Sequence, residues 1–133
     1  MSGTCLTPYN LRSVKADFEA TFATLRKLLK PYEKSYPPIV DEPGKYYLAC
    51  KVSKTKSGFP IWFGGVEIRK NYVSFHLIPV YGNPALLKEA SPSLLKHKQG
   101  KSCFNFTAIE PAHVKELTAL TKKGFAGFVK KFP

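Results

Sequence analysis

The first run of regularly spaced apolar side chains has the period of an α-helix. The residues that recur at spacings of three and four are Phe18, Phe22, Leu25, Leu29 and Tyr32. This spacing places them on one face of an amphipathic helix. Ser13 is suited to cap the start of this helix, and Pro31 disfavours its continuation. We therefore expect a helix over residues 14 to 31, a flexible lead-in at residues 1 to 9, and an extended crossing over the proline-rich residues 37 to 43.

Beyond Lys45 the spacing of apolar residues changes to a period of two. Alternation over residues 45 to 52 predicts a half-buried strand, and the run from Phe59 to Ile68, apolar on both faces, predicts a central strand. A third strand is expected over residues 72 to 78. Its alternation places Val73, Phe75 and Leu77 on one face and Tyr72, Ser74 and His76 on the other. Because short polar turns separate the three runs, we expect an antiparallel meander.

The second half of the chain combines short helices, one strand and a long helix. Pro84 and Pro92 each follow a capping residue and open a short helical run, and residues 102 to 106 have the pattern of a fourth strand. Pro111 opens a final amphipathic helix. The sequence therefore predicts an α+β fold in a single domain over residues 1 to 133. In this fold, two long helices cover one face of a four-stranded, mainly antiparallel sheet, and two short helices precede the last strand.

Composition excludes several broad classes of protein. Of the 133 residues, 44% are hydrophobic and 14% are aromatic, which is enough for a core and argues against intrinsic disorder. The longest stretch without a charged residue, from Asn71 to Leu87, contains Pro79, Gly82 and Pro84 and is unsuited to a membrane helix. The N-terminus lacks the basic and apolar segments of a secretory signal. We therefore expect a cytoplasmic protein with no membrane partner.

The sequence contains no motif for catalysis, for a disulfide framework or for metal binding. Cys5, Cys50 and Cys103 are widely spaced and odd in number, so we expect free thiols, with Cys50 and Cys103 in packing roles. The run Gly100-Lys101-Ser102 lacks the upstream glycine of a phosphate-binding loop. No nucleophile elbow or metalloprotease motif occurs. The sequence therefore predicts no catalytic residue, no metal site and no cofactor, and an enzyme is not expected.

The positive charge is the strongest unspecific feature of the chain. The 21 Lys and Arg residues outnumber the 9 Asp and Glu residues, for a formal net charge of +12. Lysines interleaved with aromatic rings can hold the phosphate backbone of a nucleic acid. However, only three of the basic residues are arginines, which read base edges best, and lysines on helices are usually solvated. The candidate anion-binding residues are Lys88, Lys96, Lys98 and Lys101, around a basic turn predicted at residues 96 to 101.

A second candidate site lies on the sheet face that the long helices are expected to leave uncovered. Trp62, Tyr72, His76 and Asn105 can share this face and form an aromatic and polar surface. Such a surface suits a small ligand or a protein partner, and it makes the protein a binding domain with an unknown partner. The alternative is that the rings complete a second small core beneath residues 79 to 100.

Two motifs resemble a known family. Residues 70 to 79, Lys-Asn-Tyr-Val-Ser-Phe-His-Leu-Ile-Pro, and residues 100 to 106, Gly-Lys-Ser-Cys-Phe-Asn-Phe, precede a long final helix. This combination is similar to the YdhG-like domain family of unknown function, over about residues 14 to 130. The resemblance implies an α+β sandwich, in agreement with the predicted order of elements. Some relatives are described as frataxin-like intracellular iron chaperones, so the resemblance also implies iron delivery as an alternative function.

Overall fold

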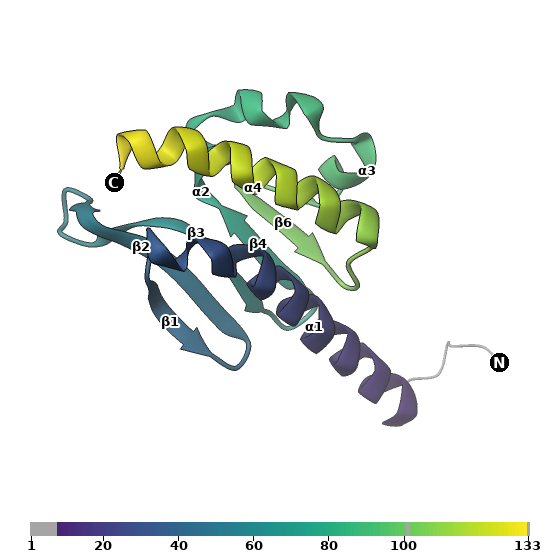
Figure 1. Cartoon of the computed structure of the whole chain (residues 1–133). Coiled ribbons are helices and arrows are strands. Elements are labelled where there is room, and N and C mark those ends of the chain that lie inside the picture. The colour runs from purple at the N-terminus through teal and green to yellow at the C-terminus, as the bar shows by residue number, and fades with distance from the viewer. Residues whose placement is uncertain (1–7, 101, 133) are drawn as a thin grey trace.

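Two long helices, the first and last elements of the chain, lie on one side of the sheet in an α+β fold (Figure 1). The computed structural model describes residues 8 to 100 and 102 to 132, with side chains from residue 17 onward. The helices are α1 (Pro8–Leu29), the 3-10 helix η1 (Lys30–Lys34), α2 (Ile78–Gly82), the 3-10 helix η2 (Pro84–Glu89), α3 (Pro92–Leu95) and α4 (Pro111–Lys131). The strands are β1 (Pro38–Glu42), β2 (Lys45–Lys54), β3 (Pro60–Ile68), β4 (Val73–Leu77), β5 (Lys98–Gln99) and β6 (Cys103–Phe106).

The strands form one antiparallel sheet in the order β1-β2-β3-β4-β6-β5. The expected meander is β2, β3 and β4, and β6 is the expected fourth strand. The prediction of four strands is wrong, because β1 and β5 extend the sheet to six. Neither added strand carries an alternating apolar pattern: β1 occupies the predicted extended crossing, and β5 consists of two residues of the predicted basic turn. Both are held by backbone pairing, with β2 and β6 respectively.

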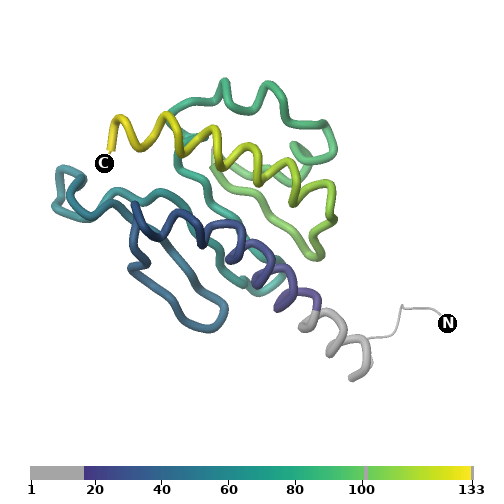
Figure 2. Tube along the Cα trace, in the orientation of Figure 1, coloured from purple at the N-terminus to yellow at the C-terminus, as the bar shows by residue number. Residues whose placement is uncertain are grey.

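One face of the sheet carries the hydrophobic core and packs against α1 and α4. Figure 2 shows the traces of both helices on the same side of the strands. On β4, Val73, Phe75 and Leu77 are fully buried on this face, as the alternation predicts. Helix α1 contributes Leu25 and Leu29 to the same core, and α4 contributes Leu117, Leu120 and Phe128. None of the helices in the described part of the chain is both long enough and apolar enough to span a membrane.

Phe63 of β3 lies at the centre of an aromatic cluster inside this core. Its ring centroid is 4.8 to 5.8 Å from those of four other rings, which belong to Tyr32, Tyr36, Phe125 and Phe128. The Tyr36 hydroxyl donates a hydrogen bond of 2.8 Å to the carbonyl of Phe132. Burial raises the pKa of Tyr36 to about 12, so the hydroxyl stays protonated. The cluster therefore joins the segment after α1 to the end of α4.

The first helix is longer at its start than its apolar face predicts. It begins at Pro8 instead of residue 14, so Ser13 lies inside the helix and does not cap it. Pro is well tolerated in the first turn of a helix, where its missing N–H has no partner to lose. At the other end, α1 stops at Leu29, and Pro31 lies in the 3-10 helix η1. Residues 1 to 7 of the predicted lead-in lie outside the described residues.

The connection between β4 and β6 packs along α4 (Figure 1). Pro79 of α2 lies against Gly124 of α4, and Leu94 of α3 is fully buried in the main core. The sequence predicts two short helices here, and the structure has three, because α2 begins directly after β4 with Pro79 in its first turn. Since this connection lies on the helix side of the sheet, it does not form the alternative small core over the opposite face, where Trp62 is 43% exposed.

Candidate functional site

A row of aromatic rings crosses the open face of the sheet, the face opposite the helices. Tyr47 of β2 pairs with Gly65 of β3, which pairs with His76 of β4. The Tyr47 ring lies over Gly65, where a Cβ atom would come within 2.1 Å of the Tyr47 Cδ1. In this position over Gly65, the Tyr47 ring centroid is 4.8 Å from that of Trp62 and 6.1 Å from that of His76. Glycine at position 65 therefore makes room for a row of three rings.

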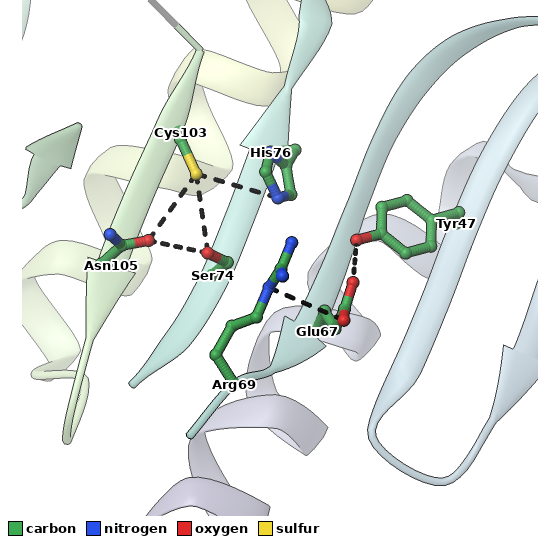
Figure 3. A network of polar contacts seen from close by, with 7 residues as sticks. All are labelled: Tyr47, Glu67, Arg69, Ser74, His76, Cys103 and Asn105. Atoms are coloured by element: carbon green, nitrogen blue, oxygen red, sulfur yellow. Dashed lines mark hydrogen bonds and ion pairs between the residues drawn. The ribbon is translucent and has the colours of Figure 1, made fainter. Parts of the chain in front are cut away.

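Tyr47 is held in place by a carboxylate. Its hydroxyl donates a 2.5 Å hydrogen bond to Oε1 of Glu67, whose Oε2 is 3.6 Å from Nε of Arg69 (Figure 3). Burial, assisted by the hydrogen bond to Glu67, raises the pKa of Tyr47 well above its usual value. The Tyr47 hydroxyl is therefore a permanent donor at neutral pH. The Arg69 side chain is about half exposed and extends toward His76.

A second polar cluster joins β4 to β6 beside His76. The hydroxyl of Ser74 donates a 2.8 Å hydrogen bond to Oδ1 of Asn105. The Cys103 Sγ lies 3.6 Å from the Ser74 Oγ, 3.6 Å from the Asn105 Oδ1 and 3.8 Å from the His76 Nε2 (Figure 3). Strand register explains the grouping, because Ser74 pairs with Asn105 and His76 pairs with Cys103. Side chains that face each other across neighbouring strands are the units that interact in a sheet.

The environment of His76 favours its neutral form. Burial is the main cause that lowers its pKa, and the positive charge of Arg69 lowers it further, while Glu67 acts in the opposite direction. Its Nε2 faces Cys103, whereas Nδ1 has no partner among the described residues. A neutral imidazole can donate or accept at that nitrogen, depending on its tautomer. His76 therefore presents one uncommitted polar atom next to the row of rings.

Lowering the pH is expected to destabilise the fold through His76. Because the folded pKa lies below the ordinary value of 6.5, protonation is less favourable in the folded than in the unfolded chain. The free energy of unfolding therefore keeps the full contribution of neutral His76 above about pH 6.5. It loses this contribution as the pH falls from there to the folded pKa. Urea unfolding at about pH 7.5 and about pH 5.5 measures the loss, which His76→Gln should reduce. An NMR titration of the imidazole that gave a pKa of 6.5 or higher would contradict this expectation.

The structure brings together three of the four predicted ligand-binding residues. Trp62 and His76 flank Tyr47, and Asn105 lies beyond Cys103 in the adjoining cluster. Tyr72 precedes β4 and is 36% exposed. The backbone carbonyl of Tyr72 accepts a 2.7 Å hydrogen bond from the N–H of Arg69, and no contact is described between its ring and the other three residues.

The predicted anion-binding lysines lie on the connection between β4 and β6. Lys88 of η2 and Lys96 after α3 are exposed, and the ammonium of Lys98 in β5 donates to the carbonyl of Gly100. Lys101 lies outside the described residues. Lys88, Lys96 and Lys98 thus lie on three successive parts of this connection, and the anion-binding site that they were expected to form stays a prediction.

Three residues of the open face escaped sequence reasoning: Glu67, Arg69 and Cys103. The sequence predicts a packing role for Cys103, yet its side chain is partly exposed and belongs to the polar cluster. Cys50, in contrast, is buried on the core side as predicted. The signal that finds Cys103 is its spacing of two from Asn105, which places both on one strand face. Only the pairing register places it beside His76.

No group of three or more His, Cys, Asp or Glu side chains suited to a metal ion occurs among the described residues. Comparisons of the chain with protein-family models, with curated proteins and with solved structures found no match. The resemblance to the YdhG-like family and the iron-chaperone function that it implies therefore remain predictions.

Proposed function

We propose that the chain is a cytoplasmic, non-catalytic binding domain of the YdhG-like type, whose open sheet face binds a small planar ligand with an acidic or other acceptor group. The observation that carries this proposal is the row of rings, in which Trp62 is 43% exposed on the face that α1 and α4 leave uncovered. Tyr and Trp side chains are enriched at interfaces, where one part of the ring is buried and the other is exposed to solvent.

Trp62 supplies the stacking surface for the ligand. The indole packs on Tyr47, which Gly65 and Glu67 hold in place from two sides. A ring that is positioned before binding loses little conformational freedom when the ligand stacks on it, so more of the interaction energy contributes to affinity. Stacking on an aromatic side chain also selects planar molecules over puckered ones.

His76 and Arg69 supply the polar end of the site. The Arg69 guanidinium extends toward His76, whose Nδ1 has no partner among the described residues. A guanidinium presents several N–H donors, and it pairs best with a planar carboxylate or a similar acceptor. Asn105 acts through its neighbours: its Oδ1 accepts from Ser74 and Cys103, and Cys103 in turn contacts His76. We therefore expect a ring that stacks on Trp62 and directs an acceptor group toward Arg69.

The geometry of Cys103 and His76 supports binding more than catalysis. In sites with a nucleophilic cysteine, a third group orients the imidazole that activates the thiol. Here the amide of Asn105 contacts the sulfur atom, and among the described residues no side chain bonds to the second nitrogen of His76. The thiol therefore serves to connect Asn105 to His76.

Binding of 2-naphthoate, with decahydro-2-naphthoate as its saturated counterpart, tests the proposal. The chain has a single tryptophan, so the indole N–H gives one NMR signal that reports on Trp62. We expect the planar acid to shift this signal and those of His76 and Arg69, and the saturated acid to bind at least about fivefold more weakly. Trp62→Ala should weaken binding at least about tenfold.

Charge removal provides a matched pair of variants. Arg69→Ala should weaken 2-naphthoate binding about tenfold, because a hydrogen-bonded ion pair is lost. Lys70→Ala removes the same charge one residue away and should change binding less than about twofold. Equal losses in the two variants, or unshifted signals from Trp62 at saturating ligand, would exclude the open face as the site.

A further inference from the structure

An open apolar groove lies on the helix side of the molecule, between α2, η2 and the C-terminal half of α4. Its volume is about 420 Å³, within the range of sites that bind small molecules. Its apolar lining residues are Ile61, Ile78, Pro79, Leu86, Phe128 and Phe132. This α2–α4 groove is separate from the open face, because the sheet lies between the two.

Two glycines of α4 shape the α2–α4 groove. At Gly124 a Cβ atom would lie 2.9 Å from the Cβ of Pro79, so glycine permits α2 to pack closely against the helix. At Gly127, almost one turn further along, a Cβ atom would meet nothing within 4 Å. Glycine inside a helix is unfavourable compared with alanine. Gly127 therefore leaves space at a position where alanine would favour the helix and where a long side chain would extend into the groove.

The polar lining of the groove includes two lysines. Lys123 is paired with Glu89, so its charge is already compensated. The ammonium of Lys131 lies 5.5 Å from the ring centroid of Phe132, and no carboxylate of the described residues pairs with it. The groove thus combines an apolar interior with an ammonium group at the end of α4 that forms no ion pair with the described residues. A ligand complementary to it has an apolar body and one negative charge.

We propose that the α2–α4 groove binds an amphiphilic carboxylate, with a body of about ten carbon atoms in the groove and the carboxylate beside Lys131. The size follows from comparison with a buried apolar cavity of about 150 Å³, which holds one benzene molecule. The groove has 420 Å³, but part of that volume is open to solvent. The assignment is independent of the ligand proposed for the open face.

Titration of the full chain with decanoate, followed by NMR and calorimetry, tests this site. In the wild-type protein, the backbone signals of Gly124, Gly127 and Phe132 should shift together. Gly127→Leu should weaken decanoate binding at least about tenfold, because the new side chain occupies the groove. Gly127→Ala, which also favours the helix but adds only a methyl group, should weaken it less than about threefold.

The headgroup is tested separately. Lys131→Gln should weaken decanoate binding about fivefold and leave the weaker binding of 1-decanol unchanged, because only the acid carries a charge. Lys130→Gln removes a neighbouring exposed charge that does not line the groove, and it should change decanoate binding less than about twofold. Signal shifts confined to the open face, undiminished binding by Gly127→Leu, or equal losses in the two lysine variants would overturn the proposal. The shifts in the wild-type protein decide the location even if Gly127→Leu does not fold.

Discussion

Replacing Phe63 with alanine is expected to lower the free energy of unfolding by about 3 to 5 kcal/mol. The side chain is fully buried, and it contacts the four rings that join η1 and its flanking residues to α4. Truncation removes the transfer free energy of a benzyl group and leaves a cavity between two elements that cannot easily close together. The loss is therefore expected near the upper end of the range for single substitutions.

Phe59 offers a matched control for this experiment. It lies in the same segment of the chain, four residues earlier, but its side chain is 69% exposed. Phe59→Ala should change the free energy of unfolding by no more than about 0.5 kcal/mol. Urea unfolding, followed by circular dichroism, measures both variants under the same conditions. A loss below about 1.5 kcal/mol for Phe63→Ala would mean that the aromatic cluster is not the centre of the core.

Replacing Gly65 with alanine is expected to lower the free energy of unfolding by about 2 to 4 kcal/mol. The added Cβ would lie 2.1 Å from Cδ1 and 2.8 Å from Cγ of Tyr47. These atoms belong to the base of the ring, so the whole side chain must move. That movement breaks the hydrogen bond from the Tyr47 hydroxyl to Glu67 and separates Tyr47 from Trp62.

The effect of Gly65→Ala should be visible in Trp62 as well as in stability. The indole loses its packing partner, so its fluorescence maximum should shift toward that of a solvent-exposed tryptophan. Gly82→Ala is the control, because a Cβ atom there meets nothing within 4 Å. It should leave both the fluorescence maximum and the midpoint of unfolding nearly unchanged. Unchanged stability in Gly65→Ala would show that the Tyr47 ring does not rest on Gly65.

Patterning of apolar residues predicts the elements that bury a regular stripe. The final helix begins at Pro111 as expected, and the meander strands and β6 lie within about two residues of the predicted ranges. The two faces of β4 are also as predicted. These elements pack against the core along most of their length, so the spacing of their apolar residues reflects which positions are buried.

Elements that are stabilised mainly by backbone pairing or by distant partners cannot be found in this way. The strand β1 pairs with β2 through backbone groups, and its residues are exposed or only half-buried. The same limit applies to side-chain clusters. His97 lies in the turn between α3 and β5, and His113 lies in α4, yet their ring centroids are 4.9 Å apart. Their proximity, like that of Cys103 and His76, depends on a register that the local sequence does not specify.

The two outermost strands also determine how the sheet meets other chains. An exposed strand edge is a template on which another chain can add a strand and start aggregation. The strand β1 starts at Pro38, contains a register shift between Pro38 and Val40, and carries Asp41 and Glu42. At the opposite side, β5 offers only two residues. Both edge strands thus have features by which natural β-proteins prevent edge-to-edge polymerisation. Since the edges are protected in this way, the broad face of the sheet is the part that remains available for recognition.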